Sequence, residues 1–255
     1  MGEDMKKIDL LLVISIILIS LFGLIMIYSS SYVWAEYKFN DPYKFVRTQA
    51  MFLIIGYVLM IFISNINYLK YLKKSNLIFL CCLILLILVL IPGIGTVRNG
   101  SRSWFGIGGF GIQPSEFTKL GLIIFTSKYL AFNEKKLKDI KNGVLPILLV
   151  LMLIFGLIML QPDFGTGVII VVTITVLLFV SGVSMSFFIK LGILGLLGVV
   201  GLIVVAPYRM KRIVSFLNPW SDPLGSGFQI IQSLYAIGPS GLLGKGLGNS
   251  IQKHF

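Results

Sequence analysis

The sequence predicts an all-α fold, a polytopic bundle of membrane-spanning helices. Hydrophobic residues make up 56% of the 255 residues, and the mean hydropathy is +0.94. Charged residues make up only 13%, whereas a soluble domain carries roughly a quarter. A soluble core could not absorb this much apolar surface without large exposed patches. The hydrocarbon of a bilayer is therefore the solvent that fits this chain.

Seven apolar segments are long enough to cross a bilayer, which takes about 17 to 25 helical residues. Only a helix satisfies every backbone polar group within such a segment, and strands of a membrane barrel would be shorter and would alternate in polarity. We therefore expect seven helices in a single membrane domain that covers the whole chain, residues 1–255. The segments are residues 8–28, 50–66, 76–94, 114–131, 144–160, 166–182 and 187–206.

The positive charge of the short loops predicts the orientation. Loop 68–75 holds three lysines and no acid, and loop 133–143 holds four lysines and two acids. Both loops lie on the side of the N-terminus if seven spans alternate, and basic loops stay in the cytoplasm. We therefore expect a cytoplasmic N-terminus, and we attribute most of the net charge of +12 to topology and not to a nucleic-acid partner. The outer side then receives segments 29–49, 95–113 and 161–165 and a large extracellular loop, 207–255.

A basic and aromatic cluster occupies the second outer segment. Arg98, Arg102 and Trp104 lie within seven residues. Tryptophan alone is common at a membrane interface, but arginine suits bidentate binding of phosphate. We take Arg102 and Trp104 as candidate substrate-binding residues.

The following helix begins with two ionisable residues on one face. Pro114 is a favourable first helical residue, and Glu116 and Lys119 are three apart, so their side chains are neighbours. Ionisable groups near hydrocarbon usually pair or line a cavity. Two interpretations stay open: a structural ion pair within the bundle, or a cation, Lys119, at the mouth of a substrate groove.

Two further acids are candidates. The tight connection Gln161-Pro162-Asp163-Phe164-Gly165 is typical of a turn in which Asp163 caps the next helix, although Asp163 could also line a polar cavity. Asp222 is the only acid among the 49 residues of segment 207–255. It could simply belong to a turn, act as a general base, or hold a divalent cation that a pyrophosphate brings. Three cations precede it: Arg209, Lys211 and Arg212.

Several motifs together resemble the SEDS family of shape, elongation, division and sporulation proteins, which includes FtsW, RodA and SpoVE. Residues 24–30, 90–95 and 206–209 look most like the FtsW/SpoVE branch. The family has ten spans, so the resemblance implies that this chain, which ends at Phe255 after seven, is truncated at its C-terminus. The motifs are Asn99-Gly-Ser-Arg-Ser-Trp104, Gln113-Pro-Ser-Glu-Phe-Thr-Lys119, Gln161-Pro-Asp-Phe-Gly165 and Asn218-Pro-Trp-Ser-Asp222-Pro-Leu-Gly-Ser-Gly-Phe-Gln-Ile-Ile-Gln-Ser233.

The resemblance implies a peptidoglycan glycosyltransferase that polymerises lipid II, a disaccharide-pentapeptide on undecaprenyl pyrophosphate, at the outer face of the bacterial cytoplasmic membrane, for cell division or spore cortex synthesis. It implies a class B penicillin-binding protein and other division or sporulation membrane proteins as partners. The family's essential outer-loop aspartate falls on Asp222, its outer-loop tryptophan on Trp104 and its helix-start lysine on Lys119.

The chemistry of the residues agrees with that reading. A sugar hydroxyl needs a base, and Asp222 is the candidate. A pyrophosphate leaving group needs cations, which Arg102, Lys119, Arg209, Lys211 and Arg212 could supply. No cofactor is certain, although Mg²⁺ or Mn²⁺ suits a pyrophosphate. The single histidine, His254, argues against a histidine metal site. A lipid II flippase and a non-catalytic scaffold for division or sporulation remain alternatives.

Overall fold

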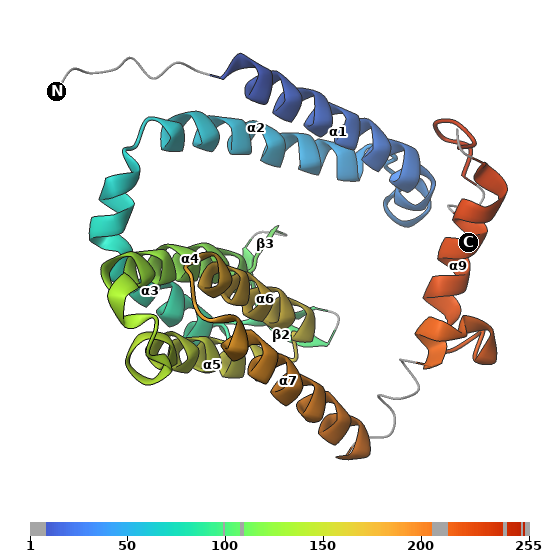
Figure 1. Cartoon of the computed structure of the whole chain (residues 1–255). Helices are drawn as coiled ribbons and strands as arrows, with labels where there is room; N and C mark the ends of the chain where they lie inside the picture. The colour runs from blue at the N-terminus through green and yellow to red at the C-terminus, as the bar shows by residue number, and fades with distance from the viewer. Residues whose placement is uncertain are drawn as a thin grey trace. The chain divides into compact units, whose positions relative to one another are not determined.

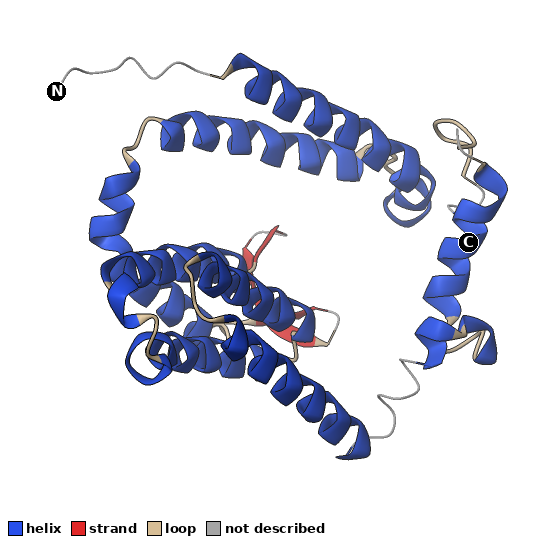
Figure 2. Ribbon diagram, in the orientation of Figure 1, coloured by secondary structure: helices blue, strands red, loops and turns tan. Residues whose placement is uncertain are grey.

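The computed structural model describes residues 9–98, 100–107, 110–205, 214–241, 244–250 and 252. Helices dominate these residues (Figure 2). The chain divides into two compact units. The first comprises Met1–Asn65 with Val199–Phe255, and the second comprises Ile66–Gly198. Each unit is described separately below.

A helical hairpin opens the first unit. Helix α1 spans Leu10–Phe39 and α2 spans Lys44–Ser64, and the two run side by side (Figure 1). Asp9 begins α1 by accepting a hydrogen bond from the Leu12 N–H. Asn40 ends it in the left-handed conformation (φ 52°), which suits asparagine better than most residues.

Two predicted loops are wrong, because both are helical. Residues 68–75, expected as a loop, form the first turns of α3 (Tyr68–Leu88), which the Asn67 side chain caps. In segment 29–49, α1 continues to Phe39, well past its predicted end at residue 28, and only residues 40–43 form a turn. Hydropathy marks where a helix is apolar, whereas lysine and tyrosine at a membrane edge can continue it with their polar ends in water.

The second unit is a bundle. After α3 come α4 (Pro114–Phe132), α5 (Leu145–Met159), α6 (Phe164–Val180) and α7 (Met185–Val205), of which the part up to Gly198 belongs to this unit. Helix α3 packs closely on α4, because a Cβ at Gly121 would lie 2.7 Å from the Cys82 Sγ atom. Small residues allow such close packing of helices in membranes. The core consists of aliphatic side chains buried between the helices, including Leu86, Leu122, Ile147, Ile154, Ile158, Ile170 and Ile174.

Each of the seven predicted segments contains a helix in its described part, and the all-α polytopic fold is confirmed. The third segment was predicted too long, because α3 ends at Leu88 and not at residue 94. Among the described residues, four helical segments are both long and apolar enough to cross a membrane: Leu10–Phe39, Lys44–Ser64, Tyr68–Leu88 and Ile140–Met159. Helix α6 and the described apolar part of α7 are shorter. Helix α4 has spanning length but carries Glu116, Lys119 and Lys128.

The connecting segments are structured. Three strands, β1 (Thr96–Arg98), β2 (Ser101–Ile107) and β3 (Phe110–Ile112), form an antiparallel sheet in that order, which was not expected from the sequence. A 3-10 turn η1 (Glu134–Lys136) and a π turn η2 (Ile140–Val144) join α4 to α5.

The C-terminal segment belongs to the first unit. It contains the 3-10 turn η3 (Pro219–Ser221), helix α9 (Phe228–Ile237) and the 3-10 turn η4 (Gly238–Ser240). The backbone N–H of Gly248 donates to the Ser29 Oγ atom over 2.7 Å. This bond joins segments 29–49 and 207–255, both of which are predicted to lie on the outer side of the membrane.

Candidate functional site

The two faces of strand β2 have different surroundings. Ser101 and Ser103 lie on one face, where the Ser101 hydroxyl donates to the Gln161 carbonyl, the Ser101 and Ser103 Oγ atoms are 3.0 Å apart, and Ser103 is buried. Arg102 and Trp104 alternate with these serines, so they project from the opposite face. Both are half-buried. The sheet therefore rests on the α5–α6 turn through its serines and leaves its arginine and tryptophan on the other face.

Arg98 belongs with Trp104. The Arg98 guanidinium carbon lies 5.2 Å from the centroid of the Trp104 ring, within the range of a cation–π contact. The same guanidinium occupies the space that a side chain at Gly111 would need. Two members of the predicted basic and aromatic cluster, Arg98 and Trp104, are thus in contact, and the role of Arg102 stays a prediction.

Glu116 and Lys119 form an ion pair on the first turns of α4. Their Oε1 and Nζ atoms are 2.8 Å apart. The Glu116 side chain is 55% exposed and that of Lys119 is 23% exposed, so the lysine is the more deeply placed partner. The stem of Lys119 lies beside Ile170 and Thr173 of α6. Both residues belong to α4, so the ion pair lies within one helix, and substrate binding by Lys119 stays a prediction.

Asp163 caps α6 and also braces α4. Its Oδ1 atom accepts from the Thr166 N–H at 3.2 Å, and its Oδ2 atom accepts from the Thr166 hydroxyl at 2.9 Å. The Gln113 side-chain amide donates to Oδ2 over 2.8 Å. Because Gln113 immediately precedes α4, these bonds hold the starts of two helices together. Asp163 thus makes the contacts of a helix cap, and direct substrate binding by Asp163 stays a prediction.

These contacts bring three distant segments together at one end of the second unit. Ser101 bonds to Gln161, and Gln113 bonds to Asp163. The strands around Arg102 and Trp104, the start of α4 and the α5–α6 turn therefore share one end of the bundle. No local pattern in the sequence marks Ser101, Gln113 or Gln161 as functional, because their partners lie about 50 to 75 residues away along the chain.

Asp222 lies in the first unit, directly after η3. Its Oδ2 atom accepts hydrogen bonds from the N–H and the hydroxyl of Ser226, both at 2.9 Å, and its backbone carbonyl accepts from Gly227 at 3.0 Å. A Cβ at Gly225 would collide with the carboxylate. Asp222 is exposed, and these bonds fix its orientation at the surface.

The described residues do not include the three cations that precede Asp222. Arg209, Lys211 and Arg212 lie outside the described ranges, so their predicted role stays a prediction. Within the described ranges, no three His, Cys, Asp or Glu side chains gather as metal ligands.

The fold and these motifs define a polytopic helical membrane protein with polar clusters at the ends of its helices. The chain belongs to the FtsW/RodA/SpoVE family, because the model of that family, described as "Cell cycle protein", matches residues 9–255. The resemblance to the SEDS family, and to its FtsW/SpoVE branch, is thereby confirmed.

Two curated relatives illustrate the match. Stage V sporulation protein E of Bacillus subtilis is 54% identical over 247 residues, which cover 97% of this chain and 68% of that protein. The probable peptidoglycan glycosyltransferase FtsW of Saccharophagus degradans is 38% identical over 253 residues, which cover 99% of this chain and 65% of that protein. The chain thus spans about two thirds of the length of these relatives.

Solved structures show the same fold. A chain of a peptidoglycan synthase complex, described as coordinating polymerization and crosslinking, matches with a TM-score of 0.61 and 28% identity over 86% of this chain and 64% of that chain. The rod shape determining protein RodA of Thermus thermophilus matches with a TM-score of 0.51 and 23% identity, over 91% of this chain and 87% of RodA. The second likeness bears on the fold alone.

Proposed function

We propose that this protein is a peptidoglycan glycosyltransferase that polymerises lipid II at the outer face of the cytoplasmic membrane, for cell division or spore cortex synthesis. Curated relatives carry the name peptidoglycan glycosyltransferase, which supports the reaction class. In this proposal the two units belong to one membrane domain, the N-terminus is cytoplasmic, and segment 207–255 lies outside the cell.

Asp222 is the general base of the proposed reaction. Its carboxylate takes the proton from the acceptor sugar hydroxyl as that oxygen bonds to the donor sugar, and the bond from the donor sugar to pyrophosphate breaks. The observation that carries this role is the placement of an exposed carboxylate by two bonds from Ser226, in a segment with no other acid. A base must be both oriented and accessible to a sugar.

Cations bind the pyrophosphate in this proposal. Arg102, Lys119, Arg209, Lys211 and Arg212 are the candidates, since developing negative charge on a leaving group is stabilised by fixed positive charge. Trp104 presents a ring supported by Arg98, which suits contact with a sugar or with the membrane interface. Glu116 positions Lys119 through the ion pair, and Asp163 positions the start of α6 through the cap. In this proposal both acids also contact the substrate.

A penicillin-binding protein of class B is the proposed partner. The related synthase complex is described by two activities, polymerization and crosslinking, and the proposed reaction of this chain accounts for the first of them. Other division or sporulation membrane proteins would join the same assembly.

Polymerisation of lipid II by the purified chain in detergent tests the proposal. Asp222→Asn should lower the rate about 10²- to 10⁴-fold, the usual contribution of a general base, while the thermal unfolding midpoint stays within error. Asp41→Asn is the matched control, because Asp41 also lies in the first unit and outside the proposed chemistry, and it should polymerise at the unaltered rate. Undiminished polymerisation by Asp222→Asn would refute the assignment of the base.

A lipid II flippase is the second candidate. The ion pair of Glu116 and Lys119 within an apolar helix favours it, because such groups also line polar paths through membranes. Polymerisation needs no second compartment, whereas transport does. No polymer in detergent, together with lipid II movement across liposomes that contain the chain, would favour the flippase over the enzyme.

A further inference from the structure

A pocket between α3 and α4 lies at the end of the second unit opposite the α5–α6 turn. It is lined by Asn76, Phe125, Lys128, Tyr129, Phe132 and Asn133 and has a volume of about 290 Å³. These residues come from the first half of α3, the last two turns of α4 and the residue that follows α4. The pocket is therefore separate from the cluster of Arg102, Trp104 and Lys119.

Lys128 is the charged group of this pocket, and its described partner is neutral. Its Nζ atom donates to the Asn76 Oδ1 atom at 3.2 Å. Neither ion pair found among the described residues includes Lys128, although its side chain is half-buried. A lysine offers three donors, and a half-buried cation on a membrane helix is costly without an anion. An anion in this pocket would neutralise it.

The surrounding charge is strongly positive. The first turns of α3 carry Lys70, Lys73 and Lys74, all exposed. The segment that follows α4 adds Lys135, Lys136, Lys138 and Lys141 against the two acids Glu134 and Asp139. Asp139 is already engaged, because it accepts hydrogen bonds from the Lys141 N–H and the Asn142 side chain. The potential at this end of the bundle thus favours an anion.

Aromatic side chains give the pocket an apolar wall. Phe125 stacks on Phe79 of α3 with the ring centroids 4.6 Å apart, and Phe132 is 72% exposed at the end of α4. The Tyr129 hydroxyl donates to the Asn142 carbonyl, at the boundary between the helix and its polar connection. A ligand that fits has a negative head beside Lys128 and an apolar tail beside Phe125 and Phe132.

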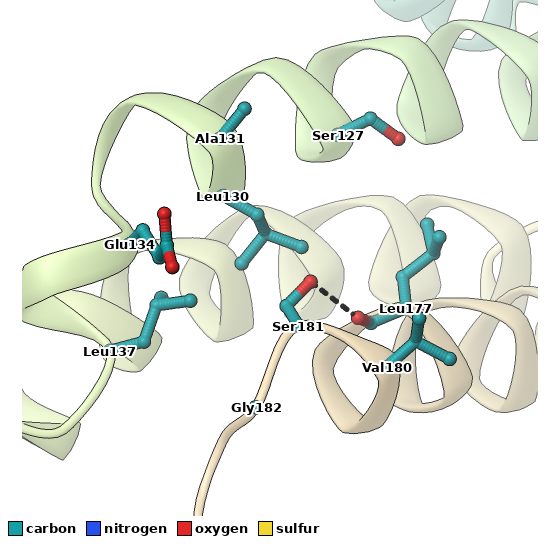
Figure 3. Close-up of a pocket in the computed structure, with 9 residues that line it drawn as sticks. All are labelled: Ser127, Leu130, Ala131, Glu134, Leu137, Leu177, Val180, Ser181 and Gly182. Atoms are coloured by element: carbon teal, nitrogen blue, oxygen red, sulfur yellow. Dashed lines mark hydrogen bonds between the residues drawn. The ribbon is translucent and has the colours of Figure 1, made fainter.

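A second pocket lined by residues of α4 differs from the pocket of Lys128 in charge. It has a volume of about 440 Å³ and lies between the end of α4 and the end of α6, with Ser127, Glu134 and Ser181 among its lining residues (Figure 3). The Ser181 hydroxyl is bonded to the Leu177 carbonyl. This pocket presents a carboxylate and no lysine, so it has the wrong charge for the same ligand.

We propose that the pocket of Lys128 binds an anionic phospholipid of the surrounding bilayer, with the phosphodiester on Lys128 and an acyl chain along Phe125 and Phe132. Basic pockets between membrane helices recognise anionic lipid headgroups in this way. The site is independent of the proposed glycosyltransferase chemistry, and it would tie this end of the bundle to membranes rich in such lipids.

Native mass spectrometry of the full chain in a neutral detergent tests this site. Phosphatidylglycerol and phosphatidylcholine with identical acyl chains are the two probes. Phosphatidylglycerol should bind more tightly, and Lys128→Gln should weaken its binding about fivefold, since one lysine near an anionic headgroup contributes about 1 kcal/mol. Lys190→Gln is the matched control, because Lys190 is an exposed lysine of the same unit that does not line the pocket, and it should bind as the unaltered chain does.

One more variant and one competition experiment complete the test of the lipid site. Phe132→Ala alters an exposed side chain and should weaken both lipids, because it shortens the apolar wall. Millimolar inorganic phosphate should not displace phosphatidylglycerol. Equal binding of the two lipids, equal losses for Lys128→Gln and Lys190→Gln, or full displacement by phosphate would each overturn the proposal.

Discussion

The side-chain amide of Gln113 donates a hydrogen bond of 2.8 Å to the carboxylate of Asp163. One residue immediately precedes α4 and the other caps α6. This bond therefore links the first residues of α4 and α6. The candidate cations Arg102 and Lys119 lie at the same end of the bundle.

Substitutions of Asp163 can separate the contribution of its cap to stability from the contribution of its charge to polymerisation. Asparagine caps a helix about as well as aspartate, so Asp163→Asn should change the free energy of unfolding by only a few tenths of a kcal/mol. Asp163→Ala should cost about 1 kcal/mol, because the bonds to Thr166 and Gln113 are lost. Thermal unfolding in detergent measures both. If the charge itself binds substrate, Asp163→Asn will lose polymerisation while it stays stable; if Asp163 only positions α6, Asp163→Asn will keep both.

The ion pair of α4 predicts unequal roles for its two members. Glu116 is largely exposed, and exposed pairs contribute about 0 to 1 kcal/mol. A double-mutant cycle with Glu116→Gln and Lys119→Gln should therefore give a coupling energy below about 1 kcal/mol. Lys119→Gln should raise the KM for lipid II more than Glu116→Gln does. Equal effects of the two single variants on KM would contradict the role of Lys119 as the substrate cation.

The close approach of Gly225 to Asp222 predicts that a methyl group can displace the candidate base. Gly225→Ala should turn the carboxylate away from its bonds with Ser226 and lower polymerisation at least tenfold, whereas the content of helix should stay unchanged. Gly238→Ala is the control, because a Cβ at Gly238 meets no atom within 4 Å. Full activity of Gly225→Ala would mean that the orientation of Asp222 does not matter.

The segment between α4 and α5 predicts a pH dependence. Hydrogen bonds from the Asn142 side chain and from the Lys141 backbone N–H lower the pKa of Asp139. A carboxylate with a lowered pKa stabilises its fold above its ordinary pKa of about 3.9 and ceases to do so as the pH falls through the lowered pKa. Protection of the amides of residues 140–144 from hydrogen exchange should thus be constant from pH 7 to 5 and fall in stronger acid.

Asn142→Ala removes the largest cause of this shift. The loss of protection should then begin at a higher pH, nearer the ordinary pKa of aspartate. Identical pH profiles for the two chains would show that the Asn142 bond does not hold this segment.

Much of the fold follows from the sequence, since a bilayer leaves the helix as the structure for a long apolar segment. The start of α4 at Pro114 was predicted from the proline itself. At the beginning of α3 and the end of α1, polar and aromatic residues continue a helix beyond its apolar part. The opposite error occurs at the end of α3, which stops at Leu88 although the apolar segment continues to residue 94. The sheet of β1, β2 and β3 was missed because two of its strands have only three residues, and its pairing depends on contacts that no period in the sequence reveals.

The candidate site was predictable by residue type and only in part by arrangement. Asp163 as a cap and Glu116 with Lys119 as a pair follow from local spacing. The bonds of Gln113 to Asp163 and of Ser101 to Gln161 join residues 50 and 60 positions apart, and local rules do not reach so far. Asp222 was chosen as the lone acid of its segment, and the bonds from Ser226 add its orientation.

The proposed reaction depends most on the side of the membrane on which Asp222 lies. Leu224, two residues away, is 91% exposed, so Leu224→Cys in a chain with Cys81→Ser and Cys82→Ala gives one reactive thiol beside the carboxylate. A membrane-impermeant maleimide applied to intact cells should label this cysteine fully, because segment 207–255 is proposed to lie outside. Labelling that occurs only after the cells are permeabilised would place Asp222 in the cytosol, away from an acceptor strand, and would contradict the proposed reaction.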